Sequence, residues 1–177
     1  MIAHTIQQVV LWCSAGLLLW AAVSDLQRFI IPNKISLSLV ALYPAYLLAG
    51  LLGGTPVDWL GGLIAAAVVF AVGFALFSLR VFGGGDVKLL SAVSLYAGSQ
   101  WLVPLIAITA LAGGVLSIGI LAAKMVSLSR LPHDLRVAVL PGDARFPMLR
   151  AAMQTQAPYG AAIAFGGLFI IYQLVRA

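Results

Sequence analysis

The sequence predicts an all-α membrane protein, a polytopic bundle of about six transmembrane helices with a short fourth span. Hydrophobic residues make up 63% of the 177 residues and charged residues only 8%, which is too little charge for a water-facing surface. Several apolar stretches reach the roughly 18 residues that a membrane helix needs. A shorter apolar stretch follows three consecutive glycines in "VFGGGDVKLL", residues 81–90.

Five stretches are long enough to span a membrane, and one lying between them is not. A helix over 87–99 would cover only about 20 Å of a hydrocarbon core about 30 Å thick. We therefore expect it to be a half-span that begins inside the membrane. Short links rich in Gly and Pro join the spans, so 1–177 is predicted to form a single membrane-embedded domain with a long loop at about 124–157. The five long spans are 6–24, 35–53, 59–79, 102–123 and 158–175.

The basic residues predict the orientation. With six crossings, the links after the first, third and fifth spans share one face and hold nine of the ten Lys and Arg residues, whereas Arg176 lies on the other face. By the positive-inside rule the first face is cytoplasmic, and both termini are outside. The nine residues are Arg28, Lys34, Arg80, Lys88, Lys124, Arg130, Arg136, Arg145 and Arg150.

The same crossing count sorts the acidic residues, all of which are aspartates. Asp25 ends the first span and Asp86 follows the third, so both are expected at the cytoplasmic end of the bundle. Asp58 lies on the opposite side and is predicted to cap the helix that follows it. Asp134 and Asp143 fall in the long loop and are interpreted as solvated turn residues. That loop is predicted to lie on the anionic inner leaflet, with a lid over the site as an alternative.

Two carboxyl groups at one membrane face predict acid–base chemistry. Charged groups in membrane helices are costly unless they are paired or functional. Two carboxyl groups in one cavity resist double ionisation and share one proton. Such a pair suits peptide hydrolysis, because one member activates water and the other polarises the carbonyl. Helix ends favour Asp86 as the base and Asp25 as the acid, although the pair would titrate as a unit.

The residues around Asp86 carry further hypotheses. Gly83, Gly84 and Gly85 are predicted to adopt unusual dihedrals and to let an extended substrate backbone approach the carboxylate; a helix-breaking turn capped by Asp86 is the alternative. Lys88 is interpreted as a topology residue that could also favour the ionised form of Asp86. Neither a metal nor another cofactor is expected, because the sequence holds one cysteine and two widely separated histidines.

Three stretches resemble one known family. "SDLQRFIIPNKIS" (24–36) and "GGGDVKLL" (83–90) resemble the paired signatures of the type IV prepilin peptidases, membrane aspartyl proteases of the GxGD type. "APYGAAIAFGG" (157–167) resembles the opening of that family's last membrane helix. The resemblance covers nearly the whole chain in order and spacing.

The resemblance implies cleavage of the short, basic leader from prepilins or prepilin-like pseudopilins, at the cytoplasmic face of a bacterial inner membrane. Asp25 and Asp86 would be catalytic. Pro32 and Asn33 would shape the loop beside the first aspartate, and Lys88 follows the second. The chain resembles the short form of the family, which lacks the cysteine-containing methyltransferase domain and serves Flp (tight-adherence) pilus systems.

The expected partners are a prepilin substrate and membrane lipid, and the oligomeric state is not predicted. No nucleic acid is expected, because topology explains the positive charge. Two other functions stay open at this point. One is a small proton-coupled transporter, in which Asp25 and Asp86 relay protons beside a broken helix. The other is a non-catalytic pilus assembly factor.

Overall fold

The computed structural model describes residues 2–55, 57–129 and 158–176, and this part of the chain consists of helices joined by short turns. Five helices among the described residues are long and apolar enough to cross a membrane. In α4 the stretch that meets this criterion is Gly84–Ala123. The predicted all-α membrane bundle is confirmed at this level. The helices are α1 (Ile2–Arg28), α2 (Asn33–Gly53), α3 (Trp59–Ser78), α4 (Gly84–Ser129) and α7 (Tyr159–Arg176).

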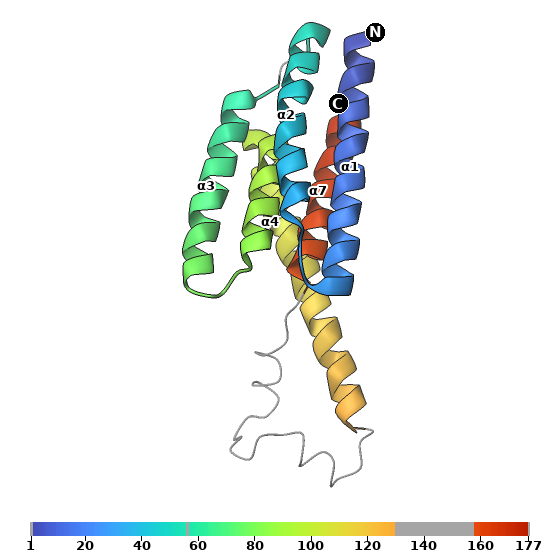
Figure 1. Cartoon of the computed structure of the whole chain (residues 1–177), viewed down its shortest axis with the longest axis vertical. Helices are drawn as coiled ribbons and strands as arrows, with labels where there is room; N and C mark the ends of the chain where they lie inside the picture. Colours follow the sequence, from blue (N-terminus) through green and yellow to red (C-terminus); the bar gives the residue numbers. More distant parts are fainter. Residues whose placement is uncertain (1, 56, 130–157, 177) are drawn as a thin grey trace.

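Helix α4 reverses direction at Gly98. Gly98 has φ 60° and ψ −164°, a conformation that is essentially restricted to glycine. Gly98 lies beside Asp58 at one end of the bundle, whereas Gly113 lies beside Tyr159 at the other (Figure 1). Helix α4 therefore has two antiparallel arms, a first arm (84–97) and a second arm (99–129). The first arm corresponds to the short helix predicted over 87–99, and the second continues six residues past the predicted end at 123.

Asp58 holds this reversal in place. One of its carboxylate oxygens accepts a hydrogen bond from the Gly61 N–H at 2.9 Å, so Asp58 caps α3 as predicted. The other oxygen accepts from the Ser99 N–H at 3.2 Å and from the Ser99 hydroxyl. The Ser99 hydroxyl, followed by the two N–H groups, lowers the pKa of Asp58. Asp58 therefore joins the start of α3 to the turn of α4.

Helix α4 occupies the centre of the bundle. It packs against α3, α7 and α2, while α1 packs against α7 and α2 (Figure 1). Small residues allow helices to approach closely in a bilayer. A Cβ added to Gly167 of α7 would lie 2.9 Å from Leu18 of α1 and 3.1 Å from Val93 of α4. The largest fully buried side chains are Leu11, Leu18, Ile35, Leu39, Leu89, Leu105, Ile163 and Ile170.

The bundle has two chemically different ends. Both chain termini lie at one end, which we call the terminal end, where Gln8 donates a hydrogen bond to the Val175 carbonyl at 3.1 Å. Helices α1 and α3 finish at the other end (Figure 1). We call it the basic end, because it carries Arg28, Lys34, Arg80 and Lys88. The predicted inner-leaflet segment, with Asp134 and Asp143, lies outside the described residues.

Candidate active site

Asp25 lies near the end of α1, at the basic end, and is only 5% exposed. The chain turns sharply after this helix. Phe29 takes a left-handed φ of 52°, and its N–H donates to the Asp25 carbonyl at 2.9 Å. The Ser24 hydroxyl donates to the Ile30 carbonyl at 2.8 Å. These two hydrogen bonds fix the turn and hold Asp25 at the inner side of the bundle.

The start of α7 contacts the Asp25 carboxylate. The Ala161 N–H donates to Asp25 Oδ2 at 3.1 Å, and the Gly160 N–H also interacts with the carboxylate. The first N–H groups of a helix lack intrahelical partners and form the positive end of its dipole. The prediction of Asp25 as the acid considered only the end of α1, so it omitted this second helix end of opposite polarity.

Gly160 permits this contact by having no side chain. A Cβ at this position would lie 2.9 Å from Asp25 Cγ and 2.5 Å from Ile31 Cδ1. Real Cβ atoms do not come so close to their neighbours, so any other residue would move α7, the carboxylate or Ile31. Glycine at position 160 therefore sets the distance between α7 and Asp25.

Asp86 is the third residue of α4 and is partly buried. Its carboxyl group accepts a hydrogen bond from the backbone of Gly83, in the manner of a helix cap. The charge of Asp25 acts on Asp86, so the two carboxyl groups lie within electrostatic range. The structure thus brings together the two acids that the crossing count assigned to one face.

The Ile31 side chain lies between Gly85, which precedes Asp86, and Gly160, which contacts Asp25. A Cβ added to Gly85 would lie 3.3 Å from Ile31 Cβ, and Ile31 Cδ1 reaches Gly160 on the other side. Ile31 is buried, with 8% of its surface exposed. The side chain that precedes Pro32 therefore spaces the Asp86 turn from the Asp25 turn.

The three glycines before Asp86 differ from the prediction. None of them has a positive φ, and Gly84 and Gly85 already belong to the first turn of α4. The predicted unusual dihedrals are wrong, because an ordinary helix start needs none. Space is what these positions require: a Cβ on Gly83 would lie 2.6 Å from Asp86 Oδ2, and one on Gly84 would lie 3.2 Å from the Phe77 ring.

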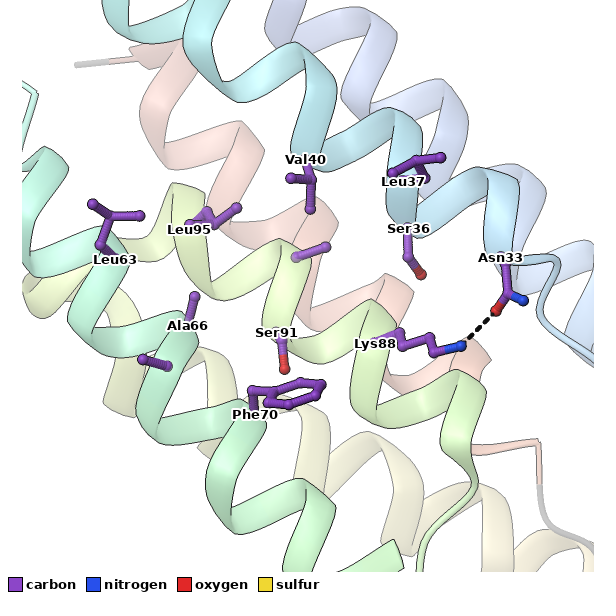
Figure 2. A pocket seen from close by; sticks show the side chains of 12 residues that line it. Asn33, Ser36, Leu37, Val40, Leu63, Ala66, Phe70, Lys88, Ser91 and Leu95 are labelled. Carbon is purple, nitrogen blue, oxygen red and sulfur yellow. Dashed lines mark hydrogen bonds between the residues drawn. The ribbon is translucent and has the colours of Figure 1, made fainter.

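Pro32, Asn33 and Lys88 form the entrance to α2. Pro32 is the N-cap residue of α2, and its carbonyl accepts from the Ile35 N–H at 3.0 Å. Lys88 Nζ donates to Asn33 Oδ1 at 3.0 Å, which ties α2 to the first arm of α4 (Figure 2). Since Lys88 follows Asp86 by two helical residues, its side chain leaves the helix about 200° around from Asp86. The alternative in which Lys88 acts on Asp86 has no support from this contact.

Sequence reasoning missed an aromatic pair beside the acids. Phe82 and Tyr159 stack with their ring centroids 6.0 Å apart. Both line a cavity of about 340 Å³ between α3, α4 and α7. Each ring immediately precedes a glycine that contacts one of the two aspartates, in "FGGGD" and "PYGAA". This shared aromatic–glycine pattern was the signal available in the sequence.

Comparisons with known proteins match the part of the chain that holds both acids. The profile of the type IV leader peptidase family matches residues 12–118. The chain is also similar to prepilin peptidase EppA of Methanothermobacter thermautotrophicus, with 36% identity over 78 residues. That alignment covers 42% of this chain and 20% of EppA, so the chain spans about a fifth of the length of this relative. No solved structure matches the chain.

Proposed function

Because the chain belongs to the type IV leader peptidase family, we propose that it is a membrane aspartyl endopeptidase that removes the leader peptide from prepilins or prepilin-like proteins. One observation carries the proposal: the buried Ile31 side chain lies against Gly85, which precedes Asp86, and against Gly160, which contacts the Asp25 carboxylate, so the two acids of different helices meet at one end of the bundle. A transporter would need a route for its cargo beyond such a pair, and an assembly factor would not need the pair at all.

The two carboxyl groups supply the acid and the base. Like charges at short range oppose double ionisation, so the pair holds one proton. The ionised member removes a proton from water as the water oxygen attacks the scissile carbonyl, and the protonated member donates to the carbonyl oxygen. The tetrahedral intermediate then collapses: the protonated member of the pair donates its proton to the leaving amine as the C–N bond breaks, and a hydroxyl of the intermediate returns a proton to the other member, so the pair again holds one proton.

The neighbouring groups orient this pair and protect it. The Ala161 N–H holds the Asp25 carboxylate in one orientation and stabilises its negative charge. The Gly83 backbone does the same for Asp86. In this proposal the stacked rings of Phe82 and Tyr159, which line the cavity between α3, α4 and α7, shield the pair from acyl chains. In this proposal Pro32 and Asn33 shape the approach to the pair, and Gly83, Gly84 and Gly85 leave room for the substrate backbone.

We further propose six crossings, in which the first arm of α4 is the short fourth span. The basic end then faces the cytoplasm of a bacterial inner membrane and both termini face outward. Arg28, Lys34, Arg80 and Lys88 at one end, against Arg176 at the other, support this orientation. The acid pair would then meet the leader on the side where prepilins are made.

Cleavage in membranes tests the proposal. Membranes containing the parent chain, Asp25→Asn or Asp86→Asn are mixed with a panel of prepilins that includes Flp-type prepilins, and leader loss is followed by mass spectrometry. The parent should cleave at least one prepilin, and each variant should be slower by a factor of about 10² or more. Equal cleavage by all three chains would contradict the assignment. Pilus assembly that both variants support without cleavage would favour the assembly factor.

A further inference from the structure

A lateral groove runs along the basic half of the bundle, with α2 and α3 as its walls and the first arm of α4 as its floor (Figure 2). Its volume is about 640 Å³. It is closed toward the terminal end, where a Cβ on Gly62 would lie 2.5 Å from both the Tyr43 hydroxyl and the Leu95 carbonyl. Asn33 of α2 and Lys88 of the first arm of α4 lie at its opposite end.

Small side chains line much of this groove, namely Ser36, Ala66, Ala67, Ser91 and Ala92. Within a bilayer, small residues mark surfaces where another helix approaches closely. From Asn33 to Val40 the α2 wall rises about 10 Å, at 1.5 Å per residue, which is about two helical turns. The groove therefore has the lining and the length to hold two turns of a helix.

Ser36 gives a second and independent indication of an occupant. This residue is 7% exposed, and its side chain points into the groove (Figure 2). Among the hydrogen bonds of the described residues none involves the Ser36 hydroxyl, whereas Ser91 on the floor donates to the Val87 carbonyl at 2.7 Å. The Ser36 hydroxyl opens into the groove and has no internal partner that competes for it, so a polar atom of an occupant can form a hydrogen bond with it.

We propose that the groove holds the apolar helix of the substrate, the membrane-embedded segment that adjoins the cleaved bond. This inference rests on the proposed function. A helix in the bilayer can enter sideways between α2 and α3 without leaving the membrane. Its end at Asn33 and Lys88 lies level with the first turns of α4, and the segment beyond it would pass around the start of α4 to reach Asp86 on the opposite face of that helix. A helix also offers polar backbone or side-chain atoms to Ser36, which a lipid acyl chain lacks.

Kinetics with two substrates test the groove. The substrates are a prepilin that the parent chain cleaves and a peptide that spans the same junction but stops before the apolar helix. Ala66→Phe places a ring where the substrate helix would pack, so we expect KM for the prepilin to rise about tenfold or more. KM for the peptide should rise no more than about twofold. Ser36→Ala should raise KM for the prepilin about threefold.

Ala75→Phe is the matched control, because Ala75 is an exposed residue of α3 that lines neither cavity. It should cleave both substrates as the parent does. If Ala66→Phe and Ala75→Phe give the same KM for the prepilin, the groove does not hold the helix and the peptidase proposal still stands. Equal losses on prepilin and peptide would also overturn the groove, because the proposal requires a larger effect on the substrate that has the apolar helix.

Cross-linking tests the groove without relying on cleavage. Cys13 is the only cysteine and is exposed, so Cys13→Ala provides a background for single cysteines. A photoreactive label on Val40→Cys, in the groove, should form an adduct with the apolar helix of the prepilin. The same label on Val103→Cys, on the exposed surface of the second arm, should not. Adducts with lipid alone, or with a second copy of the chain, would overturn the proposal even if no prepilin is cleaved.

Discussion

The Ala161 N–H donates a hydrogen bond to Asp25 Oδ2 at 3.1 Å, so the last helix of the described chain completes a site that the first helix begins. The contact depends on Gly160, whose missing side chain lets α7 start against the carboxylate. The acid pair therefore depends on three helices, α1, α4 and α7. A substitution on α7 should impair catalysis although α7 carries neither acid.

Gly160→Ala tests this dependence. The new methyl group would lie 2.9 Å from Asp25 Cγ and 2.5 Å from Ile31 Cδ1, so α7 must shift and the hydrogen bond to Asp25 must lengthen. We expect kcat for prepilin cleavage to fall about tenfold or more, with a loss of about 1–3 kcal/mol in stability from overpacking. Rates and thermal unfolding in detergent measure the two effects.

Gly16→Ala is the control for Gly160→Ala. It adds the same methyl group to a helical glycine of α1 with nothing within 4 Å, and alanine is the better helix former. It should keep parental cleavage and stability. If Gly160→Ala were as active as Gly16→Ala, α7 would have no part in orienting Asp25.

Gly98→Ala tests the reversal of α4. An added Cβ would have ordinary space, its nearest neighbour being Asp58 Oδ2 at 3.5 Å, but φ 60° with ψ −164° strains any residue other than glycine. We expect a loss of about 1–3 kcal/mol in the free energy of unfolding. Thermal unfolding in detergent measures it, with Gly114→Ala, which also has nothing within 4 Å, as the control. An unchanged melting temperature would mean that the turn relaxes easily.

Hydropathy and the count of membrane crossings were sufficient to predict the helices, the shared end of the bundle for Asp25 and Asp86, and the cap at Asp58. They were insufficient to predict how each helix is rotated about its axis. Lipid-facing surfaces are as apolar as the interior; Trp12 and Leu111 are 65% and 71% exposed. The distribution of apolar residues along a helix therefore could not identify which face of that helix is buried. The contact of Gly160 with Asp25 depends on that rotation, and so does the stacking of Phe82 on Tyr159.

Lys88→Gln tests whether Lys88 only ties α2 to α4 or takes part in the reaction. Lys88 is exposed and donates to Asn33 Oδ1 rather than to a carboxylate, so its removal loosens the tie between α2 and α4. We expect prepilin cleavage to fall less than about tenfold, since a single hydrogen bond of this kind contributes about 1 kcal/mol. Asn33→Ala should have a similar effect, and the double variant should add little. A loss as large as that of Asp86→Asn would instead indicate direct action of Lys88 on the reaction.

The Asp58–Ser99 contact makes stability depend on pH. Three hydrogen bonds, the Ser99 hydroxyl first, hold the pKa of Asp58 below its ordinary value of 3.8. The ionised form is therefore the one that the fold favours. Its contribution is fully present above the ordinary value and is lost as the pH falls through the lower pKa of the folded state.

Unfolding curves in detergent between about pH 2 and pH 6 measure this contribution. The parent chain should lose stability relative to Asp58→Asn as the pH falls below about 4, and Ser99→Ala should show a smaller loss. At neutral pH Asp58→Asn should still cleave prepilin, because Asp58 lies at the end of the bundle away from the acid pair. If Asp58→Asn abolished cleavage while Asp25→Asn and Asp86→Asn did not, the reaction would take place at the terminal end, and the six-crossing orientation would be wrong.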